Sequence, residues 1–280
     1  MMPPPTIDNH SAPFDAVAAR YDADFTERAI GRRKRAIVHR YLFPLLRKET
    51  DLLELNCGTG EDCSLMAGSV RQIVATDIST EMIAQTRRKA EARGVAIETG
   101  CLAIEELWSA TPPAIIREDD GSPRRFDLIL SNFDGINCLP DPSRLPAGIA
   151  RHLRKDGDLL LVFMPPICLL DAIAARIKGE GNPRRSGMEV HIGNGISMRT
   201  YYHDPRTIAS LFTQAGFELI AMRAVGLTTP PTRYRDFYER HRRLFGLLEP
   251  VENLLSRFPP FNRLGDHVLL HLNHRSTPLA

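Results

Sequence analysis

The sequence lacks the features that mark disulfide-rich, metal-bound and nucleic-acid-binding proteins. Its five cysteines include no C-x-x-C pair and are odd in number, so we expect neither a disulfide framework nor a bound metal. Basic and acidic residues nearly balance, at 36 and 34, and the net charge of +2 provides no overall field for nucleic acid or an anionic membrane. We therefore expect a reducing compartment and no nucleic-acid partner.

Long hydrophobic runs are also missing. The longest, residues 159–170, is interrupted by Pro165 and Pro166 and is too short to cross a bilayer. Residues 1–13 show no charged start followed by an apolar segment, so no signal peptide is expected. These absences predict a cytoplasmic protein without a transmembrane segment. Nothing in the sequence indicates its oligomeric state.

Short apolar runs alternate with helical stretches from residue 51 onward. The runs are typical of strands buried on both faces, and they comprise residues 51–55, 72–77, 96–99, 126–131 and 158–164. Residues 79–94 form a typical intervening helix, with Ser79 as its cap and Gly94 as its stop. The pattern predicts a three-layer α/β fold with a doubly wound, mostly parallel sheet.

A glycine-containing turn follows the first predicted strand in "LLELNCGTG", residues 52–60. The first strand-to-helix turn of a doubly wound sheet usually forms the floor of the ligand site. Gly58 and Gly60 permit close backbone approach and a positive φ. Asn56 stands where a third glycine is expected, and asparagine adopts the left-handed conformation more readily than most residues. Its amide is also a candidate to bond the ligand.

Two carboxylates indicate which ligand the turn holds. Asp77 closes the second predicted strand, 17 residues after Gly60, where an acid accepts hydrogen bonds from ribose hydroxyls. Glu54 lies just before the turn and would repel a pyrophosphate, but it suits a ligand with an α-amino group and a sulfonium. A dinucleotide fingerprint needs a small residue where Cys63 stands, which is a marginal fit. The cofactor is therefore expected to be of adenosine type.

With these residues in place, the sequence resembles the class I S-adenosylmethionine-dependent methyltransferases. The resemblance is carried, in the family's order, by residues 14–25, 52–61, 74–79, 126–139, 153–162 and 204–220. It implies a Rossmann-like sheet of the seven-stranded methyltransferase type, S-adenosyl-L-methionine as the cofactor, and enzymatic methyl transfer.

The resemblance also implies residues for each part of the cofactor. The methionine end would lie beside Glu54, Asn132 and Phe133, with a lid residue, Tyr21, above. The turn beneath it would consist of Asn56, Cys57, Gly58, Thr59 and Gly60. The adenosine end would contact Asp77, Ile78, Met82, Cys101 and Leu102. Two of these depart from the family pattern, since Asn56 replaces a glycine and Cys101 replaces a common acid.

We expect four regions along the chain. Residues 1–50 would form an N-terminal helical lid, and residues 51–165 the Rossmann-like cofactor-binding core. Residues 166–200 would be a substrate-side insertion after the fifth strand. Residues 201–280 would complete the sheet and add substrate-side helices.

The sequence says less about the methyl acceptor. Methyl transfer is an in-line displacement that requires alignment of the nucleophile and exclusion of water, but no fixed motif. Residues 131–134 lack the two prolines of the tetrad that accompanies methylation of nucleobase amines. The basic helix at 28–48 is interpreted as a capping helix with solvated arginines, and Arg184 and Arg185 as part of a solvated loop.

Aromatic and apolar residues favour a pocket for a small hydrophobic acceptor, methylated on oxygen or carbon. They are Met164, Met188, Tyr201, Tyr202, Phe237, Tyr238 and Phe245. Candidate catalytic groups are His191 and His203 as bases, together with Tyr21. His191 lies in a predicted hairpin strand, and the sequence does not fix which face of the hairpin its side chain lies on. Two alternatives stay open, namely an RNA methyltransferase and a non-catalytic module that binds S-adenosylmethionine.

Overall fold

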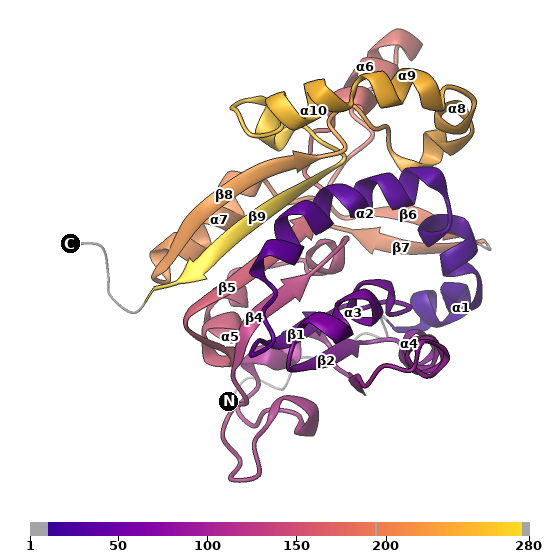
Figure 1. Cartoon of the computed structure of the whole chain (residues 1–280). Coiled ribbons are helices and arrows are strands. Elements are labelled where there is room, and N and C mark those ends of the chain that lie inside the picture. Colours follow the sequence, from indigo (N-terminus) through magenta and orange to yellow (C-terminus); the bar gives the residue numbers. More distant parts are fainter. Residues whose placement is uncertain (1–10, 194, 276–280) are drawn as a thin grey trace.

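The computed structural model describes residues 11–193 and 195–275. Its centre is a seven-stranded sheet in the order β3-β2-β1-β4-β5-β9-β8 (Figure 1). The strands are β1 (Asp51–Leu55), β2 (Gln72–Asp77), β3 (Glu98–Cys101), β4 (Phe126–Ser131), β5 (Leu153–Phe163), β8 (Phe217–Val225) and β9 (His267–His274). The first five pair in parallel, whereas β9 is antiparallel to β5 and β8. This confirms the predicted fold class.

The predicted strand bounds are confirmed for β1, β2 and β4 and need correction for two others. β3 begins two residues later than predicted, at Glu98. β5 begins five residues earlier, because Leu153 pairs with Phe126 ahead of a register shift between the two strands. The left-handed Asp156, with a φ of 60°, lies in that early part of β5.

Both faces of the sheet are buried, as the continuous apolar runs predict. Leu53 and Ile129 lie in a core shared with α5 (Leu145–His152) and α7 (Pro205–Gln214). Alternate residues such as Leu52 lie in a second core shared with α2 (Ala29–Leu42), α3 (Glu61–Met66) and α4 (Thr80–Arg93). None of the helices within residues 11–193 and 195–275 has both the length and the apolar character needed to cross a membrane.

The N-terminal segment runs through α1 (Ser11–Tyr21), the π-helix η1 (Asp22–Thr26) and α2 (Ala29–Leu42) before η2 (Phe43–Leu45) leads into β1. The prediction that the arginines of α2 are solvated is wrong for several of its cations. Arg35 is buried and forms an ion pair with Asp62, and Lys34 is fully buried and forms an ion pair with Asp266.

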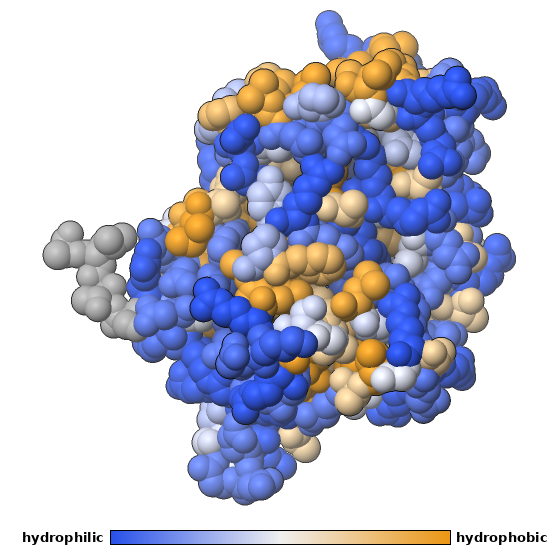
Figure 2. Space-filling view, viewed as in Figure 1, coloured by the Kyte–Doolittle hydropathy of each residue, from blue (hydrophilic) through white to orange (hydrophobic). Residues whose placement is uncertain are grey.

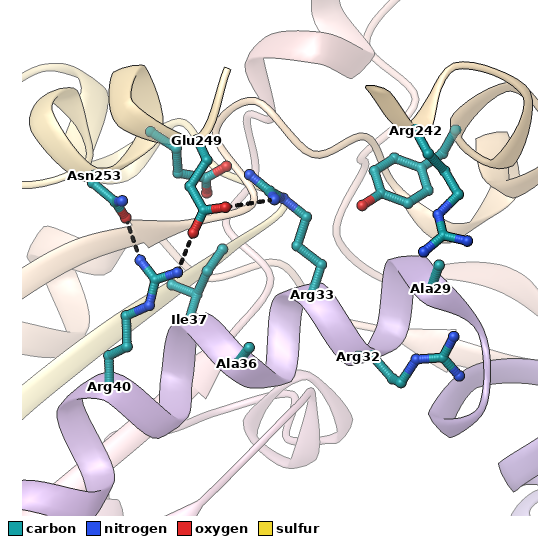
Figure 3. A pocket seen from close by; sticks show the side chains of 11 residues that line it. Ala29, Arg32, Arg33, Ala36, Ile37, Arg40, Arg242, Glu249 and Asn253 are labelled. Carbon is teal, nitrogen blue, oxygen red and sulfur yellow. Dashed lines mark hydrogen bonds and ion pairs between the residues drawn. The ribbon is translucent and has the colours of Figure 1, made fainter. Parts of the chain in front are cut away.

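Arg33 and Arg40 of α2 both bind one carboxylate, that of Glu249 on α10 (Glu249–Leu255), and Arg40 also donates to Oδ1 of Asn253 at 2.6 Å (Figure 3). These residues line a pocket of about 300 Å³ between the two helices. The charges of α2 therefore mostly attach the helix to the rest of the protein.

Two insertions extend the end of the sheet where the parallel strands finish (Figure 1). One contains α6 (Leu169–Lys178) and the hairpin of β6 (Met188–Gly193) and β7 (Ile196–Thr200). The other, between β8 and β9, contains α8 (Arg235–Arg240), α9 (Arg242–Leu247) and α10. Arg184 of the first insertion is buried and ion-paired with Asp171 and Asp266, so its assignment to a solvated loop is wrong, whereas Arg185 is exposed.

Candidate functional site

The turn after β1 has the conformation that its sequence predicts. Asn56, Gly58 and Gly60 have φ values of 47°, 57° and 75°, all in the left-handed region. A Cβ atom on Gly60 would lie 2.6 Å from Cγ2 of Thr86, so α4 leaves no room for a side chain there. The turn therefore needs glycine at position 60 for both conformation and space.

The Asn56 side chain is engaged within the protein. Its Nδ2 donates to the backbone carbonyl of Asn132 at 2.7 Å, and its Oδ1 accepts from the hydroxyl of Ser131 at 2.6 Å. The amide thus connects the carboxyl ends of β1 and β4. This arrangement corrects the expectation that the amide is available to a ligand.

Asp77 lies at the carboxyl end of β2, beside the turn. Its Oδ2 accepts from the backbone N–H of Gly58 and its Oδ1 from that of Ser79, both at 2.9 Å. Burial raises the pKa of Asp77 to about 6 despite these two donors. A carboxylate has about four acceptor positions, so it can still accept hydroxyl groups.

The residues predicted around the adenosine differ in exposure. Ile78 is half-buried and Cys101, in register with Asp77 on β3, is exposed. Met82 is buried against α1, and Leu102 is buried in the core beneath α5, so neither side chain is open to solvent. Cys57 is buried too, with its Sγ 3.7 Å from Oγ1 of Thr86.

Glu54 and Asn132 supply two buried oxygen atoms without partners. Glu54 is 2% exposed, and its burial raises its pKa well above the usual range. Its Oε2, and Oδ1 of Asn132, accept no hydrogen bond from any residue within 11–193 or 195–275. Buried orphan acceptors are rare in folded proteins. Two of them at the ends of the neighbouring strands β1 and β4 fit a ligand with a cationic donor group.

A carboxylate that the sequence analysis missed organises this corner. Asp62, in the first turn of α3, is bound by Arg35, by Nε2 of His39 at 2.6 Å and by Nδ2 of Asn132 at 2.7 Å. Burial alone would raise the pKa of Asp62, but the charge of Arg35 and the bond from His39 outweigh it and lower that pKa. In the sequence, the only local indication of this role of Asp62 is that an acidic residue stands two positions after Gly60.

Asp134 and His267 form a second pair that the sequence analysis missed. Phe133 and Asp134 follow β4 with φ values of 54° and 75°, a costly conformation for residues other than glycine. Oδ1 of Asp134 lies 3.0 Å from Nε2 of His267, whose Nδ1 lies 3.2 Å from Oδ2 of Asp266. Burial opposes the charge on His267, but Asp134 and Asp266 raise its pKa to about 9.

The N-terminal segment lies over these groups. Burial raises the pKa of the Tyr21 hydroxyl, and the charges that act on it include those of Arg35, Asp134 and Asp77. Asp22 of η1 attaches this segment to the glycine turn, because its Oδ1 accepts from the Thr59 hydroxyl at 2.6 Å. Tyr21 packs against the cluster formed by Val17, Ala18 and Met82, and its role as a lid residue stays a prediction.

The two histidines predicted as bases do not join this group. Strand alternation in the β6–β7 hairpin directs Ile192 and Ile196 toward α1 and leaves His191 exposed on the outer face. His203 is half-buried and its Nε2 bonds the carbonyl oxygen of Leu139 at 3.0 Å. Burial lowers the pKa of His203. Their catalytic roles stay predictions.

Comparison with known proteins places the chain among methyltransferases. A family described as "Methyltransferase domain" matches residues 25–222. A phosphatidylethanolamine N-methyltransferase of Cereibacter sphaeroides is 28% identical over 144 residues, which cover 51% of this chain and 63% of that protein. A tRNA/tmRNA (uracil-C(5))-methyltransferase of Campylobacter curvus (strain 525.92) is 24% identical over 56% of this chain and 44% of its own. The chain thus spans less than two thirds of these curated relatives.

Solved structures share the fold. A complex of DhpI with SAH has a TM-score of 0.58 at 16% identity and covers 97% of this chain and 98% of its own. The PH0226 protein from Pyrococcus horikoshii OT3 has a TM-score of 0.56 at 18% identity and covers 91% and 99%. These likenesses confirm the predicted architecture.

Proposed function

The chain belongs to the methyltransferase-domain family, and from this premise we propose that it transfers a methyl group from S-adenosylmethionine to oxygen or carbon of a small hydrophobic acceptor. When bound, the cofactor supplies an activated methyl group on a sulfonium. The DhpI structures described as complexes with SAH and with SAM and HEP show that this fold can hold the cofactor.

The observation that carries the cofactor assignment is the pair of orphan oxygens on Glu54 and Asn132. Both lie at strand ends beside the glycine turn, and both need a donor. An ammonium group would satisfy both acceptors and neutralise Glu54 in a buried setting. Asp77, at the end of the next strand, is available for the two ribose hydroxyls, with the half-buried Ile78 beside the adenine, whereas Met82 is covered by α1.

On the acceptor side, Asp134 is the group that best fits a proton acceptor. Its side chain is 39% exposed while His267 holds one of its oxygens, so its carboxylate is both oriented and reachable. The same His267 also contacts Asp266 through its Nδ1, which fixes the imidazole between the two carboxylates. An acceptor hydroxyl placed against Asp134 would lose its proton to that carboxylate as its oxygen bonds to the methyl carbon; the bond from that carbon to the sulfonium sulfur would break, with the thioether as the leaving group.

The relatives' names leave two other acceptor classes to weigh, a lipid amine and RNA. The main cationic segment is α2, and its cations form ion pairs with Asp62, Asp266 and Glu249. These pairs leave little positive potential for binding a polynucleotide. A hydrophobic acceptor remains the better fit.

The test is transfer of radiolabel from methyl-labelled S-adenosylmethionine to a panel of phenols, quinols, lipid extracts and total RNA. We expect label in the organic phase, and cofactor binding by calorimetry without any acceptor. Label found in RNA alone would refute the acceptor class. Binding without turnover on every acceptor would instead support a non-catalytic module.

A further inference from the structure

Five large apolar side chains form an exposed row along α9, α10 and the residues that follow. They are 41–77% exposed, and they are Leu244, Leu247, Val251, Leu254 and Phe258. The spacing of three, four, three and four residues places them on one face of a helical run. We call these five residues the apolar stripe.

The opposite face of the same run is fixed to the protein. Phe245 packs with Ile30 of α2 and with Tyr238, and Tyr238 also lines the pocket between α2 and α10. Glu252 is buried and accepts from the backbone N–H groups of Gly226 at 2.7 Å and Leu227 at 2.9 Å. The helices therefore cannot rotate to bury the apolar stripe without breaking these contacts.

Helix α6 adds two exposed side chains at the same end of the molecule, Ile173 and Ile177, the latter 81% exposed. Arg233, just before α8, connects the two insertions through its ion pair with Asp171 of α6 at 2.5 Å. Figure 2 shows apolar atoms gathered along this end, over α10, α9 and α6. An exposed apolar surface of this extent marks an interaction site.

The charges around the apolar stripe are mainly positive. Arg240 and Arg243 are exposed and form no ion pair with any residue in 11–193 or 195–275, and Arg257 adds a third exposed cation beside Phe258. Of the acids in α9 and α10, Glu249 binds Arg33 and Arg40 of α2 and Glu252 is buried, while Asp236 of α8 is exposed. This combination of apolar face and cationic margin is complementary to an anionic lipid surface.

We propose that the apolar stripe, with Ile173 and Ile177, docks the protein on the surface of an anionic lipid bilayer. The side chains insert at the level of the headgroups, and the arginines contact lipid phosphates. No transmembrane segment is needed, since an amphipathic helix lies in the plane of the interface.

The proposed docking face is connected to the acceptor side of the site. Asp171 of α6 binds Arg184, Arg184 binds Asp266, and Asp266 contacts His267 beside Asp134. A hydrophobic acceptor dissolved in the bilayer would thus meet the protein at the end where Asp134 lies. This last step rests on the proposed function, whereas the docking itself does not.

The experiment is flotation of the full chain with vesicles, without cofactor or acceptor. Vesicles of phosphatidylcholine with phosphatidylglycerol are compared with phosphatidylcholine alone, at low and high salt. The test variant is L247E/L254E, and its control is L65E, which changes a leucine on α3 that is 47% exposed, close to the 52% of Leu254. A second variant, R240Q/R243Q, tests the charge.

We expect binding to the anionic vesicles that weakens with salt and falls about tenfold or more in L247E/L254E, while L65E binds like the unchanged protein. R240Q/R243Q should lose the preference for anionic lipid. The proposal is overturned if the protein stays unbound, or if L247E/L254E binds as well as L65E. It is also overturned if sedimentation shows a dimer that L247E/L254E dissociates, since a second copy would then cover the stripe. Cofactor binding by calorimetry, measured on the same samples, reports separately on the proposed function.

Discussion

The Asn56 side chain occupies the space where a side chain of Gly135 would lie, and the two residues belong to the segments that follow β1 and β4. A Cβ atom on Gly135 would lie 2.2 Å from Oδ1 of Asn56, the atom that accepts from Ser131. The asparagine that replaces a glycine in the turn is therefore matched by a glycine after β4. The two positions form one structural unit, although 79 residues separate them in the sequence.

This unit predicts a coupled pair of substitutions. Gly135→Ala should lower the free energy of unfolding by about 1–3 kcal/mol, because the methyl group displaces the Asn56 amide. Asn56→Gly removes the obstacle, so the double variant should be more stable than the sum of the two single changes predicts. Urea unfolding of all four proteins measures the coupling, and strictly additive effects would contradict the unit.

Asp77→Ala should weaken cofactor binding by about 1–3 kcal/mol, the scale of losing a charged hydrogen-bond partner. The pKa of Asp77 is raised to about 6. The carboxylate that accepts hydroxyl groups is therefore lost as the pH falls through 6, and affinity should fall with it. Calorimetry at several pH values checks both effects. An affinity that is indifferent to Asp77→Ala would disprove the ribose assignment.

Glu54→Gln separates cofactor binding from stability. Glu54 is buried with a raised pKa and an orphan oxygen, so its ionised form destabilises the protein without ligand. The amide keeps the shape without the charge, so thermal unfolding of the free protein should be unchanged or shifted upward. Cofactor affinity should drop by about 1–3 kcal/mol, because the cationic partner loses its counter-charge. If the substitution lowers both the thermal stability of the free protein and the cofactor affinity, Glu54 instead has a structural role.

Asp134→Asn should lower kcat by about tenfold or more on a hydroxyl acceptor while cofactor affinity stays within about twofold. The amide keeps a hydrogen-bond acceptor but cannot take the proton. His191→Ala and His203→Ala are the comparisons, since both histidines lie outside the cluster. If either of them abolishes turnover while Asp134→Asn does not, the original prediction of a histidine base is right.

His267 predicts a pH dependence of stability. Its pKa is raised from 6.5 to about 9 by Asp134 and Asp266, which outweigh its burial. A raised folded-state pKa stabilises the protein fully below 6.5, and this contribution is lost as the pH rises through 9. As the pH rises from 6.5 through 9, the free energy of unfolding should therefore fall by about 1–3 kcal/mol more in the unchanged protein than in His267→Gln. Equal pH profiles would mean that His267 is neutral in the folded protein.

Local sequence patterns were sufficient for the parallel part of the sheet and for the glycine turn. Strand runs, the Ser79 cap, which accepts from the N–H of Met82, and the left-handed turn at residues 56–60 depend on neighbours in the chain. Their conformations follow from steric limits and hydrogen bonding over a few residues. The strand bounds of β1, β2 and β4 were accordingly predicted to the residue.

Contacts between distant segments decided the rest. The partners of Asp62 lie 23, 27 and 70 residues away, and Arg184 reaches Asp266 across 82 residues. No local pattern distinguishes such a buried ion pair from a solvated charge, which is why α2 and Arg184 were misjudged. His191 was ambiguous for a related reason, because only the packing of Ile192 and Ile196 on α1 fixes which face of the hairpin is outward.

The sequence alone determined the architecture, the glycine turn and the acid beside it, because these arise from backbone conformation and short-range spacing. The tertiary structure alone decided that Asp62 gathers Arg35, His39 and Asn132, that Asp134 pairs with His267, and that an apolar stripe faces outward. Those features depend on charged and apolar groups from segments that are distant in the sequence. Only the folded chain brings these groups into contact and removes them from water together.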